Sequence, residues 1–208
     1  MPFCAYTGLA LTPRILFGLG NPGAQYTDTP HNAGENAVRA WAAKAKLEFE
    51  RGDGPYLWTA VRRGVRAVIP TTYMNLCGQA LNKLRADIEF TSDEVLVVSD
   101  DVWLPLGRLR LRTGGSDGGH NGLKSVAEAL GTQQYPRLRL GVGPVPERQD
   151  WADFVLRPYA ASEKPAALTM TTDAVAALDL ILARGYSKAQ SEINKGPEPE
   201  TGPETGPE

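Results

Sequence analysis

The sequence predicts one α/β domain in which a single mixed, twisted sheet carries helices on both faces. Short apolar runs alternate with segments of helical periodicity, as in folds that cover a sheet with helices. The runs 57–62 and 65–70 flank Arg63-Gly64 and indicate a hairpin, so the sheet is not wholly parallel. A chain of 208 residues, 42% of them apolar, suits a single hydrophobic core.

The first half of the chain supplies a strand, a helix, the hairpin and a second helix. Residues 14–20 (RILFGLG) form an apolar run that ends in glycines, which is typical of a buried strand. A polar, turn-rich stretch follows and is expected to be a loop. Apolar residues then recur at helical spacing in 33–47, and again after the hairpin in 74–86.

The second half adds three strands and two helices. Residues 94–99 (EVLVVS) form the clearest buried strand. In 107–112 and in 137–142 leucine alternates with arginine, which places the leucines on one face of a strand and the arginines on the other. A short helix is expected over 123–130 and a long, alanine-rich helix over 162–186.

The two ends of the chain are expected to lie outside the catalytic domain, which we place at residues 13–190. Residues 1–12 lack the basic start of a signal peptide and are expected to be a disordered leader. The tail, 196–208, repeats Gly, Pro, Glu and Thr with nothing apolar to bury, so disorder is expected there as well.

Charge and composition exclude several classes of protein. The formal net charge is −2, and without the four glutamates of the tail the rest of the chain carries about +2. This is not the balance of a bulk nucleic-acid binder, so any RNA contact must come from a local basic patch. No apolar run approaches the ~18 residues of a membrane span. Cys4 and Cys77 indicate free thiols in a reducing cytoplasm.

The stretch GLGNPG (18–23) has the spacing of a dinucleotide-binding fingerprint that follows a strand. That fingerprint needs a helix that opens at the glycines, so that its N-terminus meets the pyrophosphate. Pro22 and Pro30 prevent a continuous helix until past His31. An NAD(P)-dependent oxidoreductase is therefore kept as a rival interpretation, which measured NAD(P) binding would support.

The two histidines, His31 and His120, are each followed by asparagine in a polar segment that contains glycine. Imidazole suits proton transfer near pH 7, and asparagine forms hydrogen bonds without titrating. Asp100 and Asp101 follow the strongest strand, where a carboxylate can orient an imidazole and raise its pKa. Taken singly, each segment also fits a solvated loop or strand end, and Asn75 fits a helix cap. The spacing shows no metal-ligand cluster and no serine-nucleophile elbow, so neither a metal nor a cofactor is predicted.

Taken together, these segments resemble the bacterial peptidyl-tRNA hydrolase family. The matching strings occur in the family's order across roughly residues 13–190. They are GLGNPG (18–23), Tyr26, TxHNAG (29–34), PTTYMNLCG (70–78), Asp100-Asp101 with LPLG (104–107), GGHNGLKS (118–125) and RLRLGVG (137–143). The resemblance implies a single-domain α/β enzyme that hydrolyses the ester between a peptide and the 3′ end of tRNA. We also expect a cytoplasmic monomer that uses no cofactor and does not bind membranes.

The resemblance also assigns roles to residues. His31 falls on the family's catalytic histidine, Asp100 on the aspartate that supports it, and Asn21 on the asparagine that distinguishes blocked from free aminoacyl groups. Contacts with the 3′ end or the peptide are expected from Tyr26, Tyr73, Met74, Asn75, His120 and Asn121. Apart from the resemblance, the strand alternation predicts contacts with tRNA phosphates, and the alternative is an ordinary solvated basic face. The residues are Arg110, Arg112, Lys124, Arg137 and Arg139.

The chain departs from the family pattern at a few positions that bear on local geometry and substrate preference. Pro30 stands where arginine is usual, Glu35-Asn36 where bulky apolar residues are usual, and Trp103 where an acidic residue is common. Ser116-Asp117 enlarge or polarise the glycine loop, residues 114–122 (GGSDGGHNG).

On this interpretation neutral His31 takes a proton from the attacking water, while Asp100 holds its ring. The amide of Asn21 or of Asn75 stabilises the oxyanion, and the sequence leaves open which one does so. A third interpretation is an RNA-binding module that keeps the fold without turnover. Hydrolysis of a blocked aminoacyl-tRNA separates the enzyme from that module.

Overall fold

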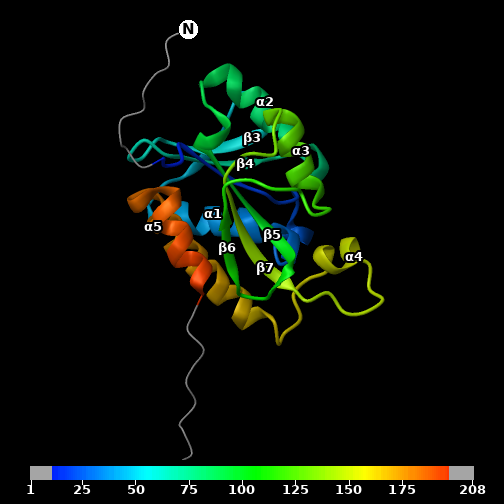
Figure 1. The fold of residues 1–208 in the computed structure, drawn as a ribbon. Coiled ribbons are helices and arrows are strands. Elements are labelled where there is room, and N and C mark those ends of the chain that lie inside the picture. Colours follow the sequence, from blue (N-terminus) through cyan, green and yellow to red (C-terminus); the bar gives the residue numbers. More distant parts are fainter. Residues whose placement is uncertain (1–10, 197–208) are drawn as a thin grey trace, which may run out of the picture.

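The computed structural model of the chain describes residues 11–196. Its centre is a seven-stranded sheet with the order β2-β3-β4-β1-β5-β7-β6 (Figure 1). The strands are β1 (Ile15–Gly18), β2 (Phe49–Arg51), β3 (Tyr56–Thr59), β4 (Arg66–Pro70), β5 (Val95–Pro105), β6 (Leu109–Arg112) and β7 (Arg137–Gly143). The tail from 197 on and residues 1–10 of the predicted leader lie outside the described residues.

The sheet is mixed, as predicted. Its central strands β4, β1, β5 and β7 run parallel, and the pairs β2–β3, β3–β4 and β6–β7 are antiparallel. The hairpin across Arg63-Gly64 is β3–β4, so that prediction is confirmed. Strand β2 was not predicted, because three residues are too few to show a period. Strand β5 was predicted too short, because its apolar run ends at polar Ser99-Asp100 while its pairing with β7 continues.

Helices cover both faces of the sheet, which confirms the predicted architecture. The α-helices are α1 (Ala33–Lys44), α2 (Gly78–Asp87), α3 (Asn121–Leu130), α4 (Trp151–Leu156) and α5 (Lys164–Lys195). Short 3-10 turns are η1 (Ala24–Tyr26), η2 (Pro30–Asn32), η3 (Met74–Leu76) and η4 (Ser92–Glu94). The apolar residues of α1 and α5 join one core cluster and those of α2 and α3 the other (Figure 1). The unpredicted α4 has only six residues, too few for a helical pattern in the sequence.

The long helix α5 is broken at Gly185, whose φ of 75° is not helical. The predicted helix 162–186 corresponds to the part before this break. The part after the break packs along the edge strand β6. There the side chain of Asn194 accepts a hydrogen bond from the Leu111 N–H (2.8 Å) and donates one to the Leu111 carbonyl (3.0 Å). The amide thus completes backbone hydrogen bonds that an edge strand would otherwise leave open.

By length and composition alone, α5 could also cross a membrane, and within residues 11–196 it is the one helix that meets this test. The test is weak for a single helix. Its residues Met170, Ala174, Leu178 and Ile181 are at most 1% exposed and belong to the core over the sheet. We therefore interpret α5 as the core helix of this domain.

Candidate active site

The parallel strands β4, β1 and β5 end at the same edge of the sheet, and a cleft of about 370 Å³ opens there. Ligands of open α/β sheets bind outside the carboxyl ends of such strands. The chain that leaves β1 supplies Asn21 to this cleft, and the chain that leaves β4 supplies Met74. Asp100 reaches it from β5, just beyond the last residue of β5 that pairs with β1.

His31 is carried into the cleft by the turn η2. Pro30 opens this turn, at a position where a missing N–H costs no hydrogen bond. The departure from the family pattern at Pro30 is therefore compatible with the site. Helix α1 follows at once, and its Gly34 lies so close to β5 that a Cβ there would be 2.1 Å from the carbonyl oxygen of Val98. This close approach brings His31 to Asp100.

The other departures beside His31 make local hydrogen bonds. Glu35 accepts one from Nε of Arg39 at 2.7 Å, and Asn36 donates one to the carbonyl of Thr27 at 2.9 Å. The second bond ties the start of α1 to the loop that precedes η2. Asn36 therefore supports this loop by a hydrogen bond, whereas Glu35 pairs within α1.

His31 and Asp100 form a hydrogen-bonded pair. Nδ1 of His31 lies 3.0 Å from Oδ1 and 3.1 Å from Oδ2 of Asp100, and the two side chains are 12% and 3% exposed. Burial lowers the pKa of His31, but the charge of Asp100 and its hydrogen bond outweigh burial, so the pKa is raised above its ordinary value. Burial raises the pKa of Asp100, but both histidines act against it, and the pKa falls well below the usual range. Asp100 is therefore an ionised carboxylate that accepts a hydrogen bond from Nδ1 of His31.

His120 binds Asp100 as well, at the same oxygen, Oδ1. Its Nδ1 accepts hydrogen bonds from the backbone N–H groups of Gly122 (3.0 Å) and Leu123 (3.3 Å) at the start of α3, so this nitrogen carries a lone pair. The proton of the neutral ring then lies on Nε2, which donates to Oδ1 of Asp100 over 2.9 Å. With Nδ1 of His31 donating to the same carboxylate, Nε2 of His31 keeps its lone pair, and it has no hydrogen-bond partner within residues 11–196.

His31, Asp100 and His120 also have the composition of a metal site. One ligand atom from each lies within 4.8 Å of the others, so the expectation that histidines on separate loops form no cluster is wrong. The donor atoms are, however, committed to one another and to the backbone of α3. A metal ion would have to displace these hydrogen bonds. The arrangement therefore favours proton transfer over metal coordination.

Asn21 presents a hydrogen-bond donor to the cleft. Its Oδ1 accepts from the backbone N–H of Met74 (2.8 Å), and its own backbone N–H and carbonyl are bonded to the side chain of Asn32 (2.9 Å each). These bonds fix the orientation of the amide. The Nδ2 group of Asn21 makes no hydrogen bond to the part of the chain that the structure describes, so its N–H groups are free donors at the cleft.

The remaining predicted contact residues come together in the same cleft. Its lining includes Tyr26, Tyr73, Met74, Asn75, His120 and Asn121. Tyr73, Asn75 and Asn121 are exposed, and neither carboxamide forms a hydrogen bond within the described chain. These groups are therefore free to bind a ligand, whereas His120 is already bonded to Asp100.

The prediction that Arg137 contacts phosphate is wrong. Its side chain is 2% exposed, and its guanidinium donates to the carbonyls of Gly115, Ser116 and Gln133 at 2.7–2.8 Å. Arg137 thus holds the glycine loop to β7. The alternating pattern identified the face of the strand on which this arginine lies, but not that the loop covers it.

The other basic residues remain accessible. Arg110 and Arg139 lie directly opposite each other on β6 and β7, which confirms that the arginines of these strands share a face. Nε of Arg139 forms an ion pair with Oδ2 of Asp101 at 2.7 Å. Arg110, Arg112 and Lys124 have no ion-pair partner within residues 11–196.

Sequence reasoning missed two large side chains of the cleft, Trp103 as a lining residue and Trp151 altogether. Trp103 was noted only as a departure from the family pattern. Trp151 belongs to the unpredicted α4, and its only signal was an aromatic residue in an otherwise polar segment. The dinucleotide interpretation is not supported, because α1 begins only at Ala33, well past the glycines.

The fold and the site define a class of protein. An open α/β sheet holds a histidine–carboxylate pair and carboxamide donors in one cleft, which is the equipment of an ester hydrolase that activates water. The sequence profile of the family described as peptidyl-tRNA hydrolase matches residues 15–201. The chain belongs to the peptidyl-tRNA hydrolase family.

Individual relatives agree with this assignment. The chain is 40% identical to the peptidyl-tRNA hydrolase of Methylacidiphilum infernorum over 181 residues, which cover 87% of this chain and 97% of that one. It is 42% identical to the peptidyl-tRNA hydrolase of Gloeobacter violaceus over 186 residues, 87% and 93% of the two chains. The crystal structure of peptidyl-tRNA hydrolase from Acinetobacter baumannii superposes with a TM-score of 0.82 at 27% identity, covering 90% and 97%. The resemblance inferred from the motifs is confirmed.

Proposed function

We propose that the chain hydrolyses the ester of peptidyl-tRNA with His31 as general base. Nε2 of His31 takes a proton from water as its oxygen attacks the ester carbonyl. The tetrahedral intermediate then expels the 3′ oxygen of the tRNA, which receives the proton from the imidazolium. The observation that carries this proposal is the pair of hydrogen bonds that Asp100 accepts, one from each histidine. They hold His31 in the tautomer that has a free Nε2.

Asn21 is proposed to bind a substrate oxygen and to discriminate against free aminoacyl-tRNA. Because Met74 occupies its Oδ1, Asn21 offers the cleft only N–H groups. A peptide or blocked amino acid has carbonyl oxygens that can accept from them. A free ammonium has only donors, and it would lose water beside Asn21 without gaining a partner, which is costly.

The test compares two substrates on one tRNA, an N-acetyl-aminoacyl ester and the unblocked aminoacyl ester. We expect the wild type to release tRNA from the first far faster than from the second. If the wild type cleaves neither ester, the proposed function is wrong, and an RNA-binding module without turnover is favoured.

Replacing Asn21 with aspartate should weaken this discrimination. One carboxylate oxygen still accepts from Met74, and the other offers the cleft a negative acceptor that pairs with an ammonium. We expect the ratio of kcat/KM for blocked over free ester to fall by about tenfold or more, the scale set by one charged hydrogen bond. Asn82→Asp, the same change at an exposed position of α2 outside the cleft, should keep the wild-type ratio. An unchanged ratio in Asn21→Asp would show that discrimination lies elsewhere.

Arg110, Arg112 and Lys124 are proposed to contact phosphates of the tRNA, with Arg139 at the edge of the cleft. Removing Arg110 and Arg112 together should weaken binding of deacylated tRNA. It should also reduce the slope of log affinity against log salt concentration by about 0.7–0.9 per lost contact. Equal salt slopes in the wild type and the double variant would place the phosphates on another surface.

Arg137→Ala should instead lower the free energy of unfolding in urea, since three carbonyls lose their donor.

We also propose that the enzyme is a cytoplasmic monomer that needs no membrane, metal or cofactor. The chemistry above uses only histidine, aspartate and asparagine side chains of this chain. Sedimentation of the purified chain tests the monomer. Full turnover after removal of transition metals by a chelator, with magnesium kept for the tRNA, tests the metal-free mechanism.

A further inference from the structure

Two tryptophans, Trp103 and Trp151, form an aromatic wall of the cleft that the proposed chemistry does not use. Their rings meet edge to face, with centroids 4.6 Å apart and an interplanar angle of 85°. They remain 62% and 44% exposed although each contacts the other. Large aromatic side chains that keep so much surface in water beside a substrate cleft are typical of a binding surface.

The fold holds both tryptophans in place. Trp103 follows Asp101 on β5, and its backbone N–H donates to Oδ1 of that carboxylate at 3.0 Å. Its indole Nε1 lies 3.4 Å from the carbonyl oxygen of Gly118 in the glycine loop. Trp103, one of the two residues of the aromatic wall, thus lies on the same strand as Asp100.

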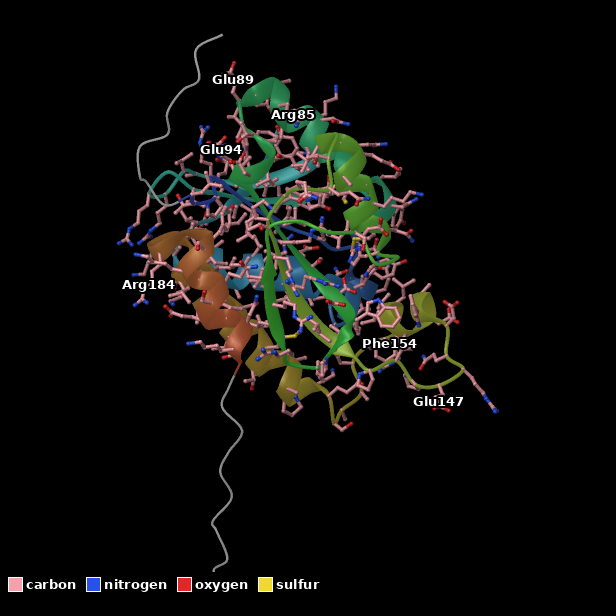
Figure 2. The ribbon with its side chains drawn as sticks, viewed as in Figure 1. Arg85, Glu89, Glu94, Glu147, Phe154 and Arg184 are labelled. Atoms are coloured by element: carbon pink, nitrogen blue, oxygen red, sulfur yellow. The ribbon has the colours of Figure 1, made fainter. Side chains whose placement is uncertain are left out.

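Trp151 is the first residue of α4, which lies against η2, the turn that carries His31. Asp150 caps α4 by accepting from the backbone N–H of Ala152 at 2.8 Å. Phe154, 2% exposed, fastens α4 to the core (Figure 2). Glu147 lies on the outlying loop before α4 (Figure 2). Both tryptophans are therefore held beside the histidine–aspartate pair.

We propose that Trp103 and Trp151 receive the side chain of the amino acid esterified to the tRNA, and that they favour aromatic and long aliphatic side chains over acidic ones. This inference rests on the proposed function. The cleft then has two kinds of wall: carboxamides for the peptide backbone and the aromatic pair for a side chain. Trp103 and Trp151 are specificity-determining residues in this scheme.

Charge favours the peptide over a nucleotide as the occupant of the aromatic wall. The charged residues of the cleft lining, apart from the two histidines, are Asp100, Asp101, Asp117 and Arg139, and the arginine is paired with Asp101. The segment 147–153 around Trp151 adds three carboxylates against one arginine. A phosphodiester would be repelled here, whereas Arg110 and Arg112, which have no ion-pair partner within residues 11–196, lie on β6. An acidic side chain of the peptide would meet the same repulsion.

The experiment measures kcat/KM on one tRNA body that carries N-acetyl-phenylalanine, N-acetyl-alanine or N-acetyl-glutamate. We expect the wild type to prefer the phenylalanyl to the alanyl ester by about tenfold or more, as apolar pockets do, and to cleave the glutamyl ester slowest. Trp103→Ala and Trp151→Ala should each bring the phenylalanyl-to-alanyl ratio toward one. Trp103→Phe and Trp151→Phe should restore most of it. Leu168→Ala, which removes a 71% exposed apolar side chain on α5, should keep the wild-type ratio.

Three outcomes overturn the proposal, and they are distinguishable. Unchanged ratios in the alanine variants, at normal turnover, overturn the aromatic wall alone. An equal loss on all three esters, together with weaker binding of deacylated tRNA, assigns the tryptophans to a base of the 3′ end. Absence of turnover by the wild type overturns the proposed function and this inference with it.

Discussion

Replacing His31 with alanine should lower kcat/KM for N-acetyl-aminoacyl-tRNA by about 10²–10⁴-fold, the usual contribution of a general base. His31 must be neutral to accept a proton, so wild-type activity rises with pH through the pKa of this residue. The rising limb of the plot of kcat/KM against pH has its midpoint at this pKa. Because Asp100 raises the pKa, the midpoint should lie above the pKa of an isolated histidine. The variant should lose the limb entirely. Turnover at the wild-type rate, with the limb intact, would exclude His31 as the base.

A stability measurement shows whether His31→Ala acts on chemistry alone. The raised pKa means that protonated His31 stabilises the folded chain through Asp100. This stabilisation is fully present below the ordinary pKa of about 6.5 and is lost as the pH rises through the raised value. The substitution should therefore cost more free energy of unfolding at about pH 5 than at about pH 8. At the pH of the assay the variant should remain folded.

Asp100→Asn should have a comparable effect, about 10²–10⁴-fold on kcat/KM, for a reason specific to this site. The Nε2 atom of His120 must be a donor, because its Nδ1 atom already accepts a hydrogen bond from the backbone of α3. The carbonyl of the new amide must therefore take the place of Oδ1, which faces His120, and its NH₂ group takes the place of Oδ2, 3.1 Å from Nδ1 of His31. This NH₂ group favours the tautomer of His31 that accepts at Nδ1 and carries its proton on Nε2, where it cannot take one from water.

The pH profile separates this effect from a general disturbance. Without the charge of Asp100, burial is left to lower the pKa of His31, so residual activity should reach its plateau at lower pH than in the wild type. Asp101→Asn is the matched control. Asp101 is similarly buried but pairs with Arg139, so its substitution should leave the position of the limb unchanged. A limb that stays in place in Asp100→Asn would mean that Asp100 does not set the pKa of His31.

Much of the candidate site could be predicted from contiguous residues. The apolar run that ends before Asp100, the glycines that follow β1 and the strings around His31 are local features. Such features can be read from a single sequence. They sufficed for the α/β architecture, for the family and for the grouping of Asn21, His31 and Asp100 in one cleft.

Other parts depend on which distant segments meet, and a local pattern does not report that. His120 was predicted as a substrate contact, but only the meeting of its loop with β5 makes it the residue that fixes the tautomer. Arg137 has the alternation of an exposed arginine, and the glycine loop that covers it lies elsewhere in the chain. Trp151 faces Trp103 because the buried Phe154 fastens a six-residue helix too short to show a period. The sequence by itself determined most of the elements, the family and the candidate base. The tertiary structure decided proton positions, burial and the aromatic wall, since these are properties of neighbours in space.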